Sequence, residues 1–211
     1  MPEAETMEYV FTLKFQLSDN DAHPTDLVER LGAAGCDDAL VGIGRPGRLA
    51  LEFTREAIDA SSAIRSALAD VRQAVPSARL VEVTPDLVGL TDAAQIVGVS
   101  RQNMRKLMLA HSANFPLPVH EGNASLWHLA DLLVWMKARG YRFPASLLEL
   151  AVVARQLNAV RELEALGLLE VETDSPAGIG LVLRRACIDG LARGHRSSGD
   201  NLPVACKLRF P

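Results

Sequence analysis

The stretch Leu90–Gly140 constrains the fold of this chain more than any other part of its sequence. Apolar periodicity predicts a short helix over Thr91–Val97, a break at Gly98 and a second helix over Ser100–Ala110. A proline-containing run and a polar turn predict a small hairpin after them, and the apolar segment from Trp127 predicts a third helix. The expected order is therefore two short helices around a tight turn, then a hairpin, then a helix.

The two short helices are expected to pack closely against each other. Thr91 or Asp92 can cap the first helix, and Ser100 is placed to cap the second. A bulky side chain in place of Ala94 would hold the helices apart, and Gly98 follows four residues later. The side chains expected to face the core are Ala93, Ala94, Ile96 and Val97 in the first helix and Met104, Leu107 and Met108 in the second.

Three segments together resemble the MerR-like and excisionase-like winged helix-turn-helix families. They are GLTDAAQIVGVSR from Gly89, FPLPV over Phe115–Val119 and WHLADLLVW over Trp127–Trp135, and they span about fifty residues. The resemblance implies that the second helix lies in the major groove of DNA and that the hairpin, the wing, lies beside the phosphate backbone or minor groove. Carried over by position, the residues implied to face DNA are Ser100, Arg101, Gln102, Asn103, Arg105 and Lys106 on the second helix and His120, Asn123 and Ser125 on or near the wing.

The wing departs from the pattern of those families. Their wing is commonly rich in arginine, whereas residues 119–125 contain Glu121 and no Lys or Arg. The second helix has a different composition, since it carries both guanidinium and amide groups. These are the side chains that read base edges in the major groove. We therefore expect the second helix to carry the specific contacts.

Charge is unevenly distributed along the chain, whose formal net charge is −4. Residues 1–87 hold eight basic and fifteen acidic side chains, a net charge of −7, whereas residues 88–144 hold six and three, a net charge of +3. Residues 145–211 balance at eight each. The local positive charge favours phosphate near the expected reading face. It lies mainly on the second helix and at Lys137, Arg139 and Arg142.

Composition excludes several other classes of protein. Hydrophobic residues make up 48% of the chain and charged residues 23%, as in an ordinary globular protein. No run approaches the length of a membrane span, and the acidic start at residues 1–5 is unlike a signal peptide, so we expect a cytoplasmic protein with no membrane partner. Cys36, Cys187 and Cys206 are odd in number and scattered, which indicates reduced structural thiols.

Residues 1–86 are expected to form an acidic α+β sandwich. The turn at residues 44–47 has the chemistry of a hairpin, with proline fixing one dihedral and glycine supplying a positive one. The order of elements is that of a ferredoxin-like split βαβ sandwich, βαββαβ. The expected elements are a strand at Glu8–Leu17, a helix at Pro24–Ala34 with Leu27, Val28 and Leu31 inward, strands at Asp38–Gly44 and Arg48–Thr54, a helix at Ser61–Val75 and a strand at Arg79–Thr84.

The chain is thus expected to hold the sandwich at 1–86, the winged helix-turn-helix at 88–140 and a long helix at 144–166. That helix carries one apolar stripe, which either forms a dimer, as in MerR-like regulators, or packs onto its own domain. The stripe consists of Leu147, Leu150, Ala154, Leu157 and Val160. Neither a structure nor a role is assigned to the tail at 167–211.

No catalytic, metal or cofactor site is expected. The glycine spacing at residues 42–47 matches a dinucleotide-binding loop, but a strand follows it and a proline removes one amide. The five histidines show neither paired helical spacing nor an obvious acidic partner, and no nucleophile elbow surrounds Ser100. Trp127 and Trp135, expected on the helix after the wing, are interpreted as core rather than as base-stacking residues.

The sequence therefore predicts a non-enzymatic, sequence-specific regulator of transcription of prokaryotic type that binds double-stranded DNA. We expect a homodimer, because one short recognition helix reads too few base pairs to be selective. The sandwich would form the dimer or bind a small effector or a protein partner. Two alternatives remain: an antitoxin-like interaction protein that represses its own operon, and an excisionase-like architectural factor that bends DNA.

Overall fold

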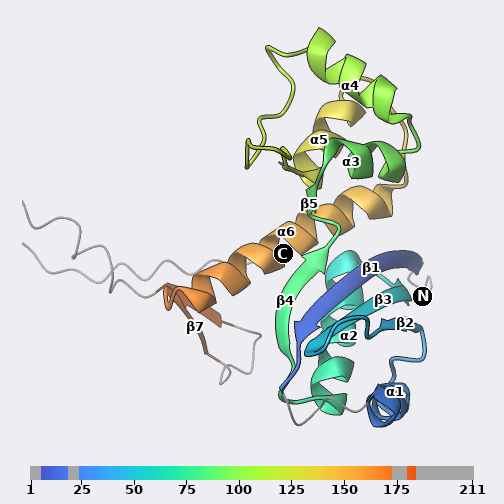
Figure 1. Cartoon of the computed structure of the whole chain (residues 1–211), viewed down its shortest axis with the longest axis vertical. Helices are drawn as coiled ribbons and strands as arrows, with labels where there is room; N and C mark the ends of the chain where they lie inside the picture. Colours follow the sequence, from blue (N-terminus) through green and yellow to red (C-terminus); the bar gives the residue numbers. More distant parts are fainter. Residues whose placement is uncertain (1–5, 19–23, 173–179, 184–211) are drawn as a thin grey trace, which may run out of the picture. The chain divides into compact units, whose positions relative to one another are not determined.

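The computed structural model of the chain describes residues 6–18, 24–172 and 180–183 (Figure 1). Contacts divide the chain into two compact units, residues 1–158 and 159–211. Within the first unit, buried apolar side chains form two clusters. One cluster belongs to the N-terminal sheet and its helices, and the other to the segment that follows them.

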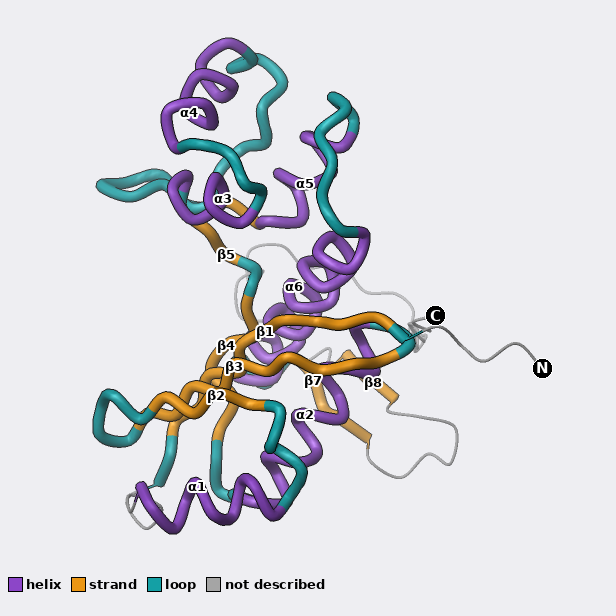
Figure 2. Tube along the Cα trace, turned by 90° about the vertical axis from the view of Figure 1, so that its right-hand side faces the viewer, coloured by secondary structure: helices purple, strands orange, loops and turns teal. Residues whose placement is uncertain are grey.

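The N-terminal part holds a four-stranded sheet in the order β2-β3-β1-β4, with every neighbouring pair antiparallel. Both helices of this part lie on the same side of the sheet (Figure 2). The mixed α+β class expected from the sequence is confirmed. The elements are β1 (Met7–Gln16), α1 (Pro24–Ala33), β2 (Ala39–Gly42), β3 (Arg48–Ala57), α2 (Ala60–Ala74) and β4 (Arg79–Thr84).

The core of this part follows the alternation that predicted β1. Tyr9, Phe11, Leu13 and Phe15 are all buried, because successive side chains of a strand point to opposite faces of the sheet. Helix α1 corrects one expectation. Leu27 and Leu31, four residues apart, are fully buried, whereas Val28 is 46% exposed, so the apolar stripe of this ten-residue helix is narrower than predicted.

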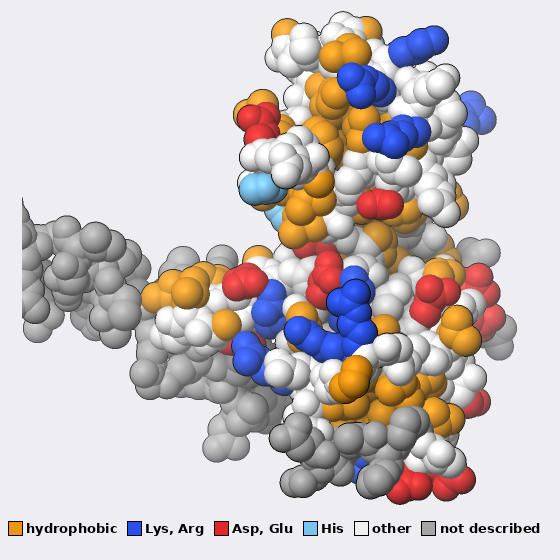
Figure 3. All heavy atoms as spheres, in the orientation of Figure 1, with side chains coloured by type: hydrophobic (Ala, Val, Ile, Leu, Met, Phe, Trp, Pro, Cys, Tyr) orange, Lys and Arg blue, Asp and Glu red, His pale blue; other side chains and the backbone are white. Residues whose placement is uncertain are grey.

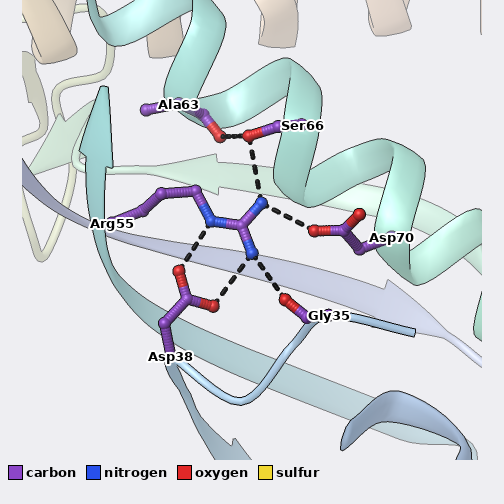
Figure 4. Close-up of polar contacts among 6 residues, drawn as sticks. All are labelled: Gly35, Asp38, Arg55, Ala63, Ser66 and Asp70. Atoms are coloured by element: carbon purple, nitrogen blue, oxygen red, sulfur yellow. Dashed lines mark hydrogen bonds and ion pairs between the residues drawn. The ribbon is translucent and has the colours of Figure 1, made fainter. Parts of the chain in front are cut away.

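Arg55 on β3 ties the chain before β2 to helix α2 (Figure 4). Its Nε and Nη2 donate to the carboxylate of Asp38 over 2.6 and 2.9 Å, and Nη2 also donates to the carbonyl of Gly35 over 2.9 Å. Its Nη1 donates to Ser66 over 3.0 Å and to Asp70 over 2.7 Å, both on α2. All five N–H donors of the guanidinium are therefore used within the fold, which leaves this arginine no donor for a ligand.

The segment after the sheet contains two short helices, a two-stranded pairing and a third helix. Its elements are β5 (Leu87–Val88), α3 (Leu90–Ile96), α4 (Arg101–Ala110), β6 (Trp127–His128) and α5 (Leu129–Lys137). Strands β5 and β6 pair antiparallel, with Val88 opposite Trp127. Trp127 therefore lies on a strand and not on the helix as expected. Ile96, expected to face the core, is 37% exposed at the end of α3.

Helix α6 (Ala145–Ala165) carries the long apolar stripe expected at 144–166. Leu150 and Ala154 are buried in the cluster of the N-terminal sheet, and Leu157 packs against the same cluster. Ala151 is buried in the other cluster, against which Leu147 packs. Much of the stripe is thus covered inside the chain, which favours the interpretation that this helix packs onto its own domain.

The tail contains one further pairing, β7 (Leu169–Glu172) with β8 (Gly180–Leu183), antiparallel. Of the three cysteines, Cys36 is buried and free, and burial is the main reason that the pKa of its thiol is raised to about 11. Cys187 and Cys206 lie outside the described residues.

A carboxylate on α6 contacts two elements of the N-terminal part. Glu149 accepts a hydrogen bond from the Tyr9 hydroxyl over 2.8 Å and one from the backbone N–H of Ala60, at the start of α2, over 3.1 Å. Burial and this hydrogen bond raise the pKa of Tyr9 to about 12 from its ordinary value of 10.0, because both favour the protonated phenol.

We therefore expect Tyr9 to weaken the fold at alkaline pH. Because the pKa of Tyr9 is raised in the folded state, its contribution to stability is fully present below pH 10 and is lost as pH rises toward 12, by roughly 1 kcal/mol at pH 11. Urea unfolding at pH 8 and pH 11 should show a larger loss for the wild type than for Tyr9→Phe. Cys36 titrates in both proteins and cancels in this comparison. Equal losses of stability in the two proteins would show that the pKa of Tyr9 is not raised by folding.

Candidate nucleic-acid interface

Helix α4 begins where the sequence predicted. The hydroxyl of Ser100 accepts a hydrogen bond from the backbone N–H of Asn103 over 3.1 Å, which confirms its expected role as the helix cap. The turn before it contains Gly98 with φ of +71°, a conformation that side chains with a β-carbon rarely adopt. The N–H of Val99 donates to the carbonyl of Ala94 over 2.9 Å and closes the turn.

The inner face of α4 is fixed by packing against α3. Met104 is fully buried, and Leu107 and Met108 pack against the same cluster. Ala93 and Ala94 of α3 are each 1% exposed, so the small side chains do allow the helices to approach. The orientation of α4 about its own axis is therefore determined by the core.

The outer face of α4 carries the residues predicted from the sequence to contact DNA. Arg101, Gln102, Asn103, Arg105 and Lys106 are all exposed. Within the described part of the chain, no salt bridge is recorded for the three cations. Figure 3 shows Lys and Arg side chains over the part of the molecule that holds α4. This face offers charged and amide donors whose hydrogen bonds are still available.

The segment predicted to form the wing makes a short turn that is closed by an antiparallel bridge between His120 and Leu126. The N–H of Leu126 donates to the carbonyl of His120 over 3.0 Å, and the N–H of Val119 donates to the carbonyl of Leu126 over 2.8 Å. Of the three residues predicted there, His120 and Asn123 are exposed and Ser125 is half-buried. The imidazole of His120 lies over Gly122, since a β-carbon on that glycine would be 2.8 Å from His120 Nε2. Among Asp, Glu, Lys and Arg, this turn at residues 119–126 therefore carries Glu121 alone.

Sequence reasoning missed a buried polar cluster centred on Asp86. Asp86 is 2% exposed and lies between β4 and β5. Its Oδ1 is 2.6 Å from His128 Nδ1, its Oδ2 accepts from Asn158 Nδ2 over 2.8 Å, and its carbonyl accepts from the N–H of Leu129 over 2.7 Å. The expectation that no histidine has an acidic partner is wrong for His128, because the partner is 42 residues away in sequence.

Asn158 also closes the outer edge of the sheet. Its Oδ1 accepts from the N–H of Val83 over 2.8 Å, and its Nδ2 donates to the carbonyl of Val83 over 2.8 Å. A side-chain amide offers the same donor and acceptor as a peptide group, so it pairs with the edge strand β4 as a neighbouring strand would. Asp86 and Asn158 thus join β4, the start of α5 and α6.

The two tryptophans are core residues, as interpreted from the sequence. Trp127 is 5% exposed and Trp135 is 8% exposed. Trp127 Nε1 donates to the carbonyl of Pro116 over 3.0 Å, whereas Trp135 Nε1 is buried with no partner among the described residues. A buried donor without a partner costs about 1–3 kcal/mol. Burial of the indole ring in the core and the cation stacked on it act against that cost.

No other kind of site emerges from the part of the chain that is described. No group of three or more His, Cys, Asp or Glu side chains could hold a metal ion there, and none of its helices is both long and apolar enough to cross a membrane. Comparisons of the chain with protein-family models, with curated proteins and with solved structures find no match. The case for a function therefore rests on the geometry of the chain itself.

Replacing Asp86 should destabilise the fold. In Asp86→Ala, His128 Nδ1 and Asn158 Nδ2 both lose the carboxylate oxygen that they face, so buried polar atoms are left without this partner. We expect urea unfolding at neutral pH to show a loss of roughly 1–3 kcal/mol. Asp37→Ala, which removes an exposed carboxylate, should stay within about 0.5 kcal/mol of the wild type. Equal stability of the two variants would show that the Asp86 cluster contributes nothing to the fold.

Proposed function

We propose that this chain is a sequence-specific, double-stranded DNA-binding regulator of transcription. In this proposal, residues 88–140 act as a MerR-like or excisionase-like winged helix-turn-helix, and residues 1–86 act as a ferredoxin-like sandwich. The observation that carries the proposal is the outer face of α4. Its basic and amide side chains are exposed without salt bridges among the described residues, while its opposite face is locked into a core.

The chemistry of this face matches base edges in the major groove. Arginine can donate two hydrogen bonds to guanine, and asparagine or glutamine can pair with adenine. Arg101, Gln102 and Arg105 would read bases, and Lys106 would neutralise a phosphate. Asn103 and Ser100 lie at the start of the helix, which is the end that recognition helices direct at bases.

Charge supports the assignment of roles to the two parts. Residues 1–87 carry a net charge of −7 and residues 88–144 one of +3, so phosphate is attracted to the second part and repelled by the first. We propose that the acidic part faces away from DNA and serves as a dimerisation module or a binding module for an effector or partner. The protein would act in the cytoplasm, without catalysis, by occupying a promoter.

Removing the two arginines of the reading face should weaken specific binding. Each base contact contributes on the order of 1–3 kcal/mol, so Arg101→Ala/Arg105→Ala should bind a selected duplex at least about 30-fold more weakly. The matched control is Arg65→Ala/Arg72→Ala, which removes two exposed arginines from α2 and should bind within about twofold of the wild type. A mobility-shift titration measures both. Unchanged affinity of the α4 variant would exclude this helix as the reader.

The regulator should bind as a homodimer. One short helix reads too few base pairs, so two copies should occupy half-sites arranged as an inverted or direct repeat. Light scattering of the complex should give two chains for each duplex, and footprinting should show two protected half-sites. A complex of one chain that protects a single half-site would contradict the dimer.

A further inference from the structure

Arg139 is an exposed arginine whose guanidinium is held in one place. Its Cζ lies 3.8 Å from the centre of the Trp135 ring, and its Nη1 donates to the carbonyl of Trp135 over 3.2 Å. Gly140, with φ of +84°, ends this part of the chain immediately afterwards. Stacking and one hydrogen bond thus fix the planar group, while the structure records no other hydrogen bond for its remaining donors within the described residues.

The ring beneath Arg139 is connected to the end of helix α4. His111, the C-cap of α4, meets the Trp135 ring edge-on with centroids 5.6 Å apart, and Phe115 does so at 5.0 Å. The indole therefore contacts both the guanidinium and the chain that leads from α4 to the wing. This position links Arg139 to the helix proposed to read DNA.

The indole of Trp135 offers an aromatic face to the guanidinium of Arg139. Its N–H is buried without a partner in the described part of the chain, so the fold gains no hydrogen bond from having an indole there. The indole does supply the aromatic face that binds a cation best. Trp135 therefore fills the core and also holds Arg139 in place.

We propose that Arg139 is a contact to the phosphate backbone of DNA that takes the place of the arginines missing from the wing. This inference rests on the proposed DNA binding. A guanidinium fixed flat on a ring presents its free N–H donors as a fork that matches phosphate oxygens, and it loses little freedom on binding. The wing itself offers Glu121 and no Lys or Arg, so it has no guanidinium or ammonium group for this contact.

Salt dependence separates a phosphate contact from a structural role. One phosphate contact contributes about 0.9 to the slope of log affinity against log salt, so Arg139→Ala should lower the slope by that amount and weaken binding about fivefold at 0.15 M salt. The loss should be the same for specific and unrelated duplexes. Arg139→Lys keeps the charge and should retain the slope. Arg72→Ala, which removes an exposed charge from α2, should change neither quantity.

The outcomes distinguish this inference from the function on which it rests. If the wild type binds no duplex, the proposed function fails. If the wild type binds and Arg139→Ala keeps both its affinity and its salt slope, the phosphate contact is excluded while the function stands. Circular dichroism and thermal unfolding of each variant confirm that folded protein is compared. A loss of affinity with an unchanged salt slope would also overturn the inference, because it would indicate a structural role.

Discussion

The buried carboxylate of Asp86 is the interaction on which the arrangement of the first unit most depends. Among the described residues no other ionic or amide side chain is buried, and Asp86 accepts hydrogen bonds at both carboxylate oxygens and at its carbonyl. Its partners come from β6, from α5 and from α6. A buried charge is tolerated only when it is fully hydrogen-bonded, so the chain segments around Asp86 must keep their positions together.

This constraint connects the sheet to the helices that follow it. Asp86 lies in the short link between β4 and β5, and Asn158 holds both Asp86 and the edge of β4. Helix α6 adds apolar contacts to both buried clusters, through Leu150 on one and Ala151 on the other. The hydrogen bonds of Asp86 and Asn158 therefore connect the sheet to the start of α5, and α5 packs in the same cluster as α4.

Local patterns in the sequence predicted the elements well and the long-range polar contacts poorly. Ser100, Gly98 and Met104 predict a capped helix after a tight turn, because these signals depend only on neighbouring positions in the sequence. The partners of Asp86 and Arg55 could not be found this way, since His128, Asn158 and Asp70 come near them only after folding. The sequence pattern predicts a helix at Trp127, whereas the residue lies on a short strand. An apolar run alone does not distinguish a short strand from the first turn of a helix.

Methylation interference on a duplex selected from random sequences tests whether α4 reads the major groove as proposed. Methyl groups on guanine N7 lie in the major groove, where an α-helix such as α4 can enter. We expect methylation of a few guanines in each half-site to abolish binding, and Arg101→Ala to remove the effect at one position. Binding that tolerates methylation at every guanine N7, or selection that returns no preferred sequence, would exclude α4 as a sequence-specific reader of the major groove.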